Sequence, residues 1–96
     1  MSCFNPFSLE DKTILVVGAS SGIGREIAIE CSKMGARMIV ASRNVLKLRE
    51  VVSEMEGNGH SIIRTDLTQK EDIENLVKNI SNVDGILISS GIGLAL

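Results

Sequence analysis

Tyrosine and tryptophan are absent from this chain of 96 residues, and His60 is its only histidine. Protein metal sites combine several ligands, and no Cys, His and carboxylate residues are spaced for one. We therefore expect no metal, and we interpret His60 as structural or solvated. No apolar run approaches the roughly 20 residues that a membrane helix needs, so we also expect no membrane partner.

Cysteine and net charge are low as well. No pattern pairs the two cysteines, Cys3 and Cys31, and we expect Cys31 to be a core thiol in a reduced, cytoplasmic protein. The formal net charge of −2 gives no reason to expect nucleic acid as a partner. The first residues lack a basic region followed by an apolar one, so we expect no signal peptide.

Glycine is concentrated in one informative stretch, Gly18-Ala19-Ser20-Ser21-Gly22-Ile23-Gly24. An apolar run precedes it and a helical pattern follows it, which is the setting of a phosphate-binding loop. The first turn of a helix has unpaired N–H groups and a partial positive charge, and glycine lets a pyrophosphate approach them. Gly24 is followed by Arg25 rather than by lysine, which disfavours a nucleoside-triphosphatase loop. An ordinary strand-to-helix turn is the alternative interpretation.

Hydrophobic periodicity alternates strands with helices along the chain. Apolar runs predict strands over 13–17, 38–41, 61–64 and 85–88. Helical spacing predicts helices over 23–34, 45–55 and 69–80. This alternation predicts an α/β fold, a Rossmann-type doubly wound parallel sheet with its first four strands in the order 3-2-1-4 and three helices. We expect one domain over 1–96, with the loops after the first and fourth strands meeting at the switch point where dinucleotides bind.

Side chains near the helix ends refine this prediction. The first helix carries an apolar stripe of Ile23, Ile27, Cys31 and Met34, which we expect to face the core. Asn44 is a predicted N-cap of the second helix. Thr68 and Glu71 have the spacing of a capping box before the third helix.

Four stretches, in chain order, resemble the short-chain dehydrogenase/reductase family, and in particular its 3-oxoacyl-[acyl-carrier-protein] reductases. The glycine loop is similar to the family pattern Thr-Gly-x-x-x-Gly-Ile-Gly, with Val17 in place of Thr. Ser42-Arg43 and Asp66-Leu67 follow the second and third predicted strands, where the family places cofactor contacts. Residues 84–91 resemble Asp-x-Leu-Val-Asn-Asn-Ala-Gly, but Ile88 and Ser89 occupy the two Asn positions. In the family these Asn residues help to tie the central strands together, so the departure implies different bonding around this strand.

The resemblance implies that the chain is the nucleotide-binding half of a longer oxidoreductase. Its cofactor-binding residues would then be Gly18, Ser20, Ser21, Gly22, Ile23, Gly24, Ser42, Arg43, Asn44, Asp66, Leu67, Ser89, Ser90 and Gly91. A carboxylate at the end of the second strand would favour NAD(H), but Ser42 stands there. Arg43 can donate charged hydrogen bonds to a 2′-phosphate, so NADP(H) is expected and NAD(H) is less favoured. A solvated arginine is the alternative.

The family's catalytic Tyr and Lys, in a Tyr-x-x-x-Lys spacing, have no counterpart in these 96 residues, so no catalytic residue is assigned. The resemblance implies reduction of a ketone or oxidation of a secondary alcohol, with a small carbonyl or alcohol substrate. A homo-oligomer is expected, because the fourth strand would leave an open sheet edge. A non-catalytic dinucleotide sensor or interaction module on the same fold is the alternative function.

Overall fold

The computed structural model describes residues 8–20, 22–80 and 82–89. Four parallel strands form one sheet in the order β3-β2-β1-β4, which confirms the predicted topology. The strands are β1 (Thr13–Val17), β2 (Arg37–Ser42), β3 (Ser61–Arg64) and β4 (Gly85–Ile88). The helices between them are α1 (Gly22–Lys33), α2 (Val45–Ser53) and α3 (Lys70–Lys78).

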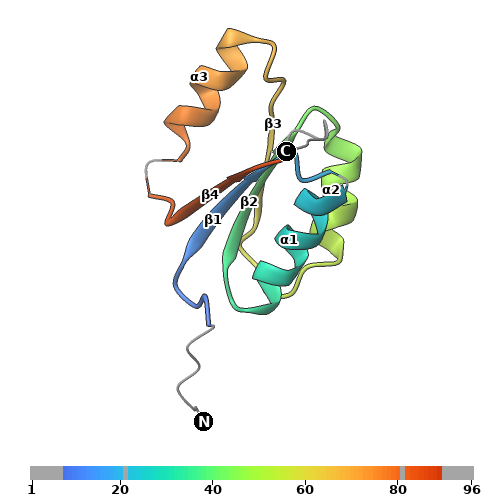
Figure 1. The fold of residues 1–96 in the computed structure, drawn as a ribbon, viewed down its shortest axis with the longest axis vertical. Coiled ribbons are helices and arrows are strands. Elements are labelled where there is room, and N and C mark those ends of the chain that lie inside the picture. The colour runs from blue at the N-terminus through green and yellow to red at the C-terminus, as the bar shows by residue number, and fades with distance from the viewer. Residues whose placement is uncertain (1–7, 21, 81, 90–96) are drawn as a thin grey trace.

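The helices lie on opposite faces of the sheet, α1 and α2 on one face and α3 on the other (Figure 1). Alternating strand residues serve the two faces, because successive side chains of a strand point in opposite directions. Val16, Met38 and Val40 are fully buried in the cluster that includes α1 and α2. Leu15 and Val17 belong to a second cluster, which includes Leu76 of α3. The core therefore has two parts, separated by the sheet.

Small residues make up most of the buried face of α1. Gly24, Ala28, Ile29 and Ser32 are the buried positions of the helix. The predicted stripe was wrong at its two ends, because Ile23 is 72% exposed and Met34, which lies beyond the helix, is 44% exposed. Side chains at i, i+4 and i+8 share one helix face, so Gly24, Ala28 and Ser32 bring the helix backbone close to the sheet.

Several element ends also differ from the sequence prediction. Ser42 lies inside β2 rather than after it, because its pairing with Arg64 continues the ladder to β3. Asn44 caps α2 as predicted, with its side chain accepting from the Lys47 N–H at 3.1 Å. The capping box at Thr68 was wrong: α3 begins after Gln69, and the Thr68 hydroxyl donates to Asp66 instead.

The β4 side of the sheet is the less covered one. Ile86 is 54% exposed and Ile88 is 66% exposed, although both lie on a strand of the sheet. At its start β4 is tied to β1, since Asp84 donates its N–H to the Thr13 carbonyl at 2.7 Å and accepts the Thr13 N–H on Oδ2 at 2.8 Å. Among the helices that the structure describes, none is long and apolar enough to cross a membrane.

Candidate functional site

The loops that follow β1 and β4 lie against each other at the carboxyl ends of the strands. A β-carbon placed on Gly18 would overlap the carbonyl oxygen of Ser89. The Ser89 N–H donates to the Val17 carbonyl at 2.7 Å, which continues the β1–β4 ladder into the loop. The two loops therefore meet where the strand order reverses, the position at which nucleotides bind in such sheets.

Glycine at the start of α1 leaves its first turn open. Gly22 has a φ of +64°, and a β-carbon built there would meet no heavy atom within 4 Å. Gly24 is buried on the opposite side, where a β-carbon would overlap the Gly18 carbonyl oxygen. The first turn of α1 contains no acidic residue. Open approach, unpaired N–H groups and the positive end of the helix dipole together suit an anionic ligand.

The remaining expected contacts of this loop have different exposures. Ser20 is half-buried and Ile23 is exposed, both at the amino end of α1. Ser21, Ser90 and Gly91 lie outside the described residues. Ser89 is half-buried beside Gly18. The described residues of this first group thus come from the ends of β1 and β4.

A second group of expected residues lies at the carboxyl end of β2. Ser42 is buried, and its hydroxyl oxygen accepts the Asn44 N–H at 3.1 Å. The Asn44 side-chain oxygen is engaged by the first turn of α2, as described above. Arg43 between them is exposed and forms no ion pair with any residue that the structure describes. Of these three side chains, Arg43 is the one that remains available to a ligand.

Asp66 and Leu67 follow β3 on the same edge of the sheet. Asp66 Oδ1 accepts the backbone N–H of Thr68 at 2.9 Å and its hydroxyl at 2.7 Å. The side-chain and then the backbone hydrogen bond from Thr68 hold the pKa of Asp66 below its usual value, with smaller contributions from Arg43 and Arg64. Leu67 is 45% exposed. Asp66 is therefore an ionised group within the electrostatic reach of two arginines.

Arg64, the last residue of β3, was missed by the sequence analysis. It pairs in register with Ser42, so it lies beside the strand end from which Arg43 extends. A surface recess of about 520 Å³ is lined by Arg43, Asn44, Val45, Leu46 and Arg64. The signal in the sequence was a cation at the end of a predicted strand that the expected order places beside the second strand, and the structure adds the register and the shared recess.

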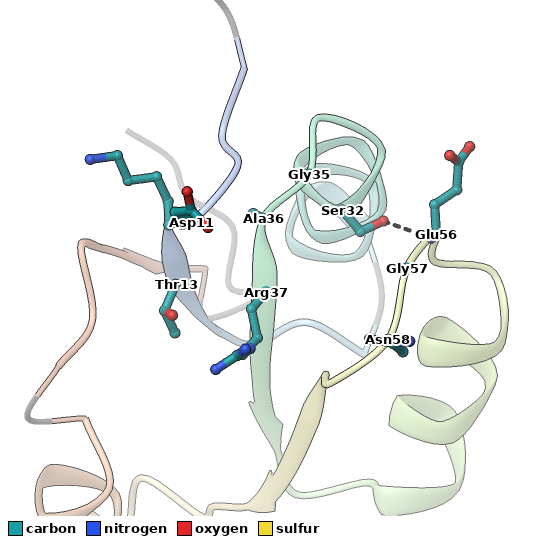
Figure 2. Close-up of a pocket in the computed structure, with 10 residues that line it drawn as sticks. Asp11, Thr13, Ser32, Gly35, Ala36, Arg37, Glu56, Gly57 and Asn58 are labelled. Carbon is teal, nitrogen blue, oxygen red and sulfur yellow. Dashed lines mark hydrogen bonds between the residues drawn. The ribbon is translucent and has the colours of Figure 1, made fainter. Parts of the chain in front are cut away.

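Another recess lies at the opposite edge of the sheet, near the amino ends of β1 and β2 (Figure 2). It has a volume of about 390 Å³ and includes Thr13, Arg37 and Glu56 in its lining. The Ser32 hydroxyl accepts the Glu56 N–H there at 3.1 Å, which ties α1 to the segment after α2 (Figure 2). This recess is separate from the strand ends that form the candidate site.

His60 and Cys31 have structural surroundings. His60 Nδ1 accepts the Met38 N–H at 3.0 Å, and Nε2 lies 2.7 Å from the Glu56 carbonyl oxygen, so His60 is structural, one of the two roles anticipated. Cys31 is half-buried against the α1–α2 cluster rather than fully buried. Burial raises the pKa of its thiol, and the neighbouring Glu30 adds to the shift. Both effects disfavour a nucleophilic thiolate.

The parallel sheet, its strand order and the glycine loop define a Rossmann-type nucleotide-binding class. A family model described as short chain dehydrogenase matches residues 12–95. The chain belongs to the short-chain dehydrogenase family, whose members use nicotinamide dinucleotide cofactors.

Individual relatives agree with this assignment. The chain is 34% identical over 91 residues to an uncharacterized oxidoreductase of Listeria monocytogenes, covering 88% of this chain and 37% of that protein. It superposes on the oxidoreductase yciK of Escherichia coli with a TM-score of 0.76 and 33% identity, covering 94% of this chain and 41% of that one. A short-chain type dehydrogenase/reductase of Mycobacterium marinum gives a TM-score of 0.70 and 31% identity, over 83% of this chain and 35% of that one. The chain thus spans less than half the length of these relatives.

Proposed function

We propose that this chain supplies the dinucleotide-binding part of an NADP(H)-dependent oxidoreductase that interconverts a ketone and a secondary alcohol. The glycine loop, the ends of β2 and β3 and the loop after β4 would hold the cofactor. When bound, the nicotinamide supplies or accepts the hydride. The chain's own residues bind and orient, and the substrate would be a small carbonyl or alcohol compound.

The open first turn of α1 supports the pyrophosphate contact. Gly22 leaves space in front of the helix N–H groups. Gly18 lets the loop pack against Ser89, and Gly24 lets the start of α1 pack against Gly18. The proposed contacts from this loop are Gly18, Ser20, Ser21, Gly22, Ile23 and Gly24. Those from the loop after β4 are Ser89, Ser90 and Gly91. Backbone N–H groups need no particular side chain, so the departure from the family at Ser89 leaves this binding mode intact.

Arg43 is the single observation that favours NADP(H) over NAD(H). It is exposed at the end of β2, where a carboxylate would instead bond the ribose 2′-hydroxyl. The Ser42 hydroxyl and the Asn44 side chain already accept local N–H groups, and Oδ1 of Asp66 accepts from Thr68. A guanidinium fork matches the oxygens of a phosphate, so Arg43 would contact the 2′-phosphate.

Calorimetric titration with NADPH and NADH tests this proposal. Replacing Arg43 by Gln should lower the affinity for NADPH by about tenfold, the equivalent of about 1.4 kcal/mol, and leave the affinity for NADH nearly unchanged. Arg49→Gln is a matched control, because Arg49 is an exposed arginine within α2 and outside the recess. An equal loss for both cofactors in Arg43→Gln would contradict a role in reading the 2′-phosphate.

Proton transfer would need a group that these residues do not supply. A positioned acid within hydrogen-bond reach is required as the carbonyl oxygen gains charge, and the 96 residues contain no tyrosine. We therefore expect NADPH binding without ketone reduction by this chain alone. Following NADPH absorbance against simple ketones and 3-oxoacyl thioesters checks this, and turnover would contradict it.

Self-association is part of the proposal. β4 is an edge strand among the described residues, and Ile86 and Ile88 are exposed on it. Open strand edges and exposed apolar side chains favour pairing with another copy. Sedimentation at micromolar concentration should show dimers or larger species, reduced by Ile86→Lys. A wild-type monomer would contradict the proposal.

A further inference from the structure

The recess at the ends of β2 and β3 contains two cationic side chains from different strands. Arg43 follows β2, and Arg64 is the last residue of β3. Both line the same space of about 520 Å³, with the start of α2 forming the rest of the wall. The site therefore has more positive charge than Arg43 alone provides.

The register explains why the two arginines lie together. Ser42 pairs with Arg64, and the Thr65 N–H donates to the Ser42 carbonyl at 2.9 Å beyond that pair. Neighbouring parallel strands lie about 4.8 Å apart, so residues at their matched ends share one edge of the sheet. The hydrogen-bonded backbone thus holds Arg43 and Arg64 at neighbouring positions, from which both side chains extend.

Arg64 is only weakly committed within the protein. Its nearest carboxylate is Asp72, with a nitrogen–oxygen distance of 3.5 Å, longer than a charge-assisted hydrogen bond. The same Asp72 Oδ2 accepts the Asp66 N–H at 2.9 Å, a better contact. The Arg64 side chain is 60% exposed. A stronger anionic partner could therefore draw it from Asp72 at little cost.

Asp66 is close enough to both guanidinium groups to interact electrostatically with each of them. Beyond the dominant hydrogen bonds from Thr68, Arg43 and Arg64 each help to hold its pKa low. The two cations thus act on one small region at the end of β3.

We infer that Arg64 is a second specificity-determining residue, which binds the 2′-phosphate of NADP(H) together with Arg43. This inference rests on the proposed function. A phosphate monoester carries about −1.5 to −2 charges near pH 7, which one guanidinium compensates only in part. Two arginines from adjacent strands would approach it from two sides, while a 2′-hydroxyl offers them no charge. Arg64 would then contribute to cofactor choice and not to general affinity.

The test measures binding of NADP⁺ and NAD⁺ to this 96-residue chain by calorimetry. Arg64→Gln should lower the affinity for NADP⁺ by about tenfold, or about 1.4 kcal/mol, and leave the affinity for NAD⁺ unchanged within about twofold. Arg64→Lys keeps the charge without the fork and should retain part of the preference. Arg37→Gln is the control for lost net charge, since Arg37 is the first residue of β2 and lies at the amino ends of the strands, opposite the candidate site. Circular dichroism verifies folding.

The outcomes separate this inference from the proposed function. A selective loss of NADP⁺ affinity in Arg64→Gln, absent from Arg37→Gln, supports the role of Arg64. Unchanged cofactor preference in Arg64→Gln, with preference lost in Arg43→Gln, overturns the inference and leaves the proposed function standing. Equal weakening of both cofactors overturns it too. Absence of dinucleotide binding by the wild-type chain overturns the proposed function and this inference together.

Discussion

Gly18 and Ser89 are in direct backbone contact, so close that a β-carbon on Gly18 would overlap the Ser89 carbonyl oxygen. Gly18 also has a φ of +86°, which side chains other than glycine rarely adopt. The Ser89 backbone cannot easily move away from Gly18, because the Ser89 N–H is bonded to the Val17 carbonyl. This contact joins the glycine loop to the end of β4.

Gly18→Ala should therefore destabilise the fold by more than about 2 kcal/mol, the sum of left-handed strain and displaced backbone. Urea denaturation measures the change. Gly85→Ala is the matched control on β4, because a β-carbon built there would lie 3.2 Å from the flexible end of the Ile14 side chain and would meet no backbone atom as closely. A Gly18→Ala variant as stable as Gly85→Ala would show that the two loops do not press together.

Gly22 should separate stability from ligand binding. Its φ is positive but its surroundings are open, so Gly22→Ala should cost only about 1–2 kcal/mol of stability. The added methyl group would occupy the approach to the α1 N–H groups, and NADPH affinity should fall at least about tenfold. Gly57→Ala carries a similar strain at φ +82° far from the site, and should lose stability without losing affinity. Equal NADPH affinity in the two variants would contradict a pyrophosphate contact at Gly22.

His60 satisfies a backbone group of a central strand. With Nε2 donating to the Glu56 carbonyl, Nδ1 is free to accept the N–H of Met38, whose side chain is fully buried. His60→Ala leaves that N–H without a partner, and we expect a loss of about 1–3 kcal/mol in urea denaturation. His60→Asn can retain an acceptor and should lose less. Indistinguishable stability of wild type and His60→Ala would refute this role.

Asp66 should make stability depend on acid. Its pKa in the folded chain lies below the ordinary 3.8, so the ionised form stabilises the fold. That contribution is present above the ordinary pKa and is lost as pH falls through the lowered value. The stability advantage of wild type over Asp66→Asn should therefore be present near pH 7 and shrink below about pH 3.8.

Thr68→Val provides the check on the cause of this shift. The Thr68 hydroxyl donates to Asp66 at 2.7 Å, and its removal should raise the pKa of Asp66 in an NMR titration. An unchanged titration would assign the shift to the remaining backbone bond and the arginines instead.

The strands and their order followed from the sequence because apolar runs between turn residues are strong local signals. β1, β3 and β4 have the predicted limits. The packed face of α1 could not be predicted in this way, since Gly24, Ala28 and Ser32 are small rather than strongly apolar. Their burial depends on how closely the helix approaches the sheet, which is a tertiary property.

The candidate site was predictable where it depends on chain-local geometry and not where it depends on register. The turn and the helix start of the glycine loop can both be predicted from consecutive residues. Arg64 is 21 positions from Arg43 along the chain, and the Ser42–Arg64 pairing is what brings both side chains to the same recess. The Thr68 capping box failed because the Asp66 carboxylate offers its hydroxyl a charged acceptor nearby.

The uneven cover of the two sheet faces sets an order in which the molecule should open. α1 buries four of its residues, whereas α3 buries Leu76 alone. Segments with little buried apolar surface exchange their amide hydrogens through local fluctuations, ahead of global unfolding. We therefore expect α3 to exchange early while β1, β2 and α1 stay protected. The glycine loop would belong to the segment whose amide hydrogens exchange most slowly, and the end of β3 would border the segment that exchanges fastest. The two halves of a bound dinucleotide would therefore contact regions that differ in their resistance to local unfolding.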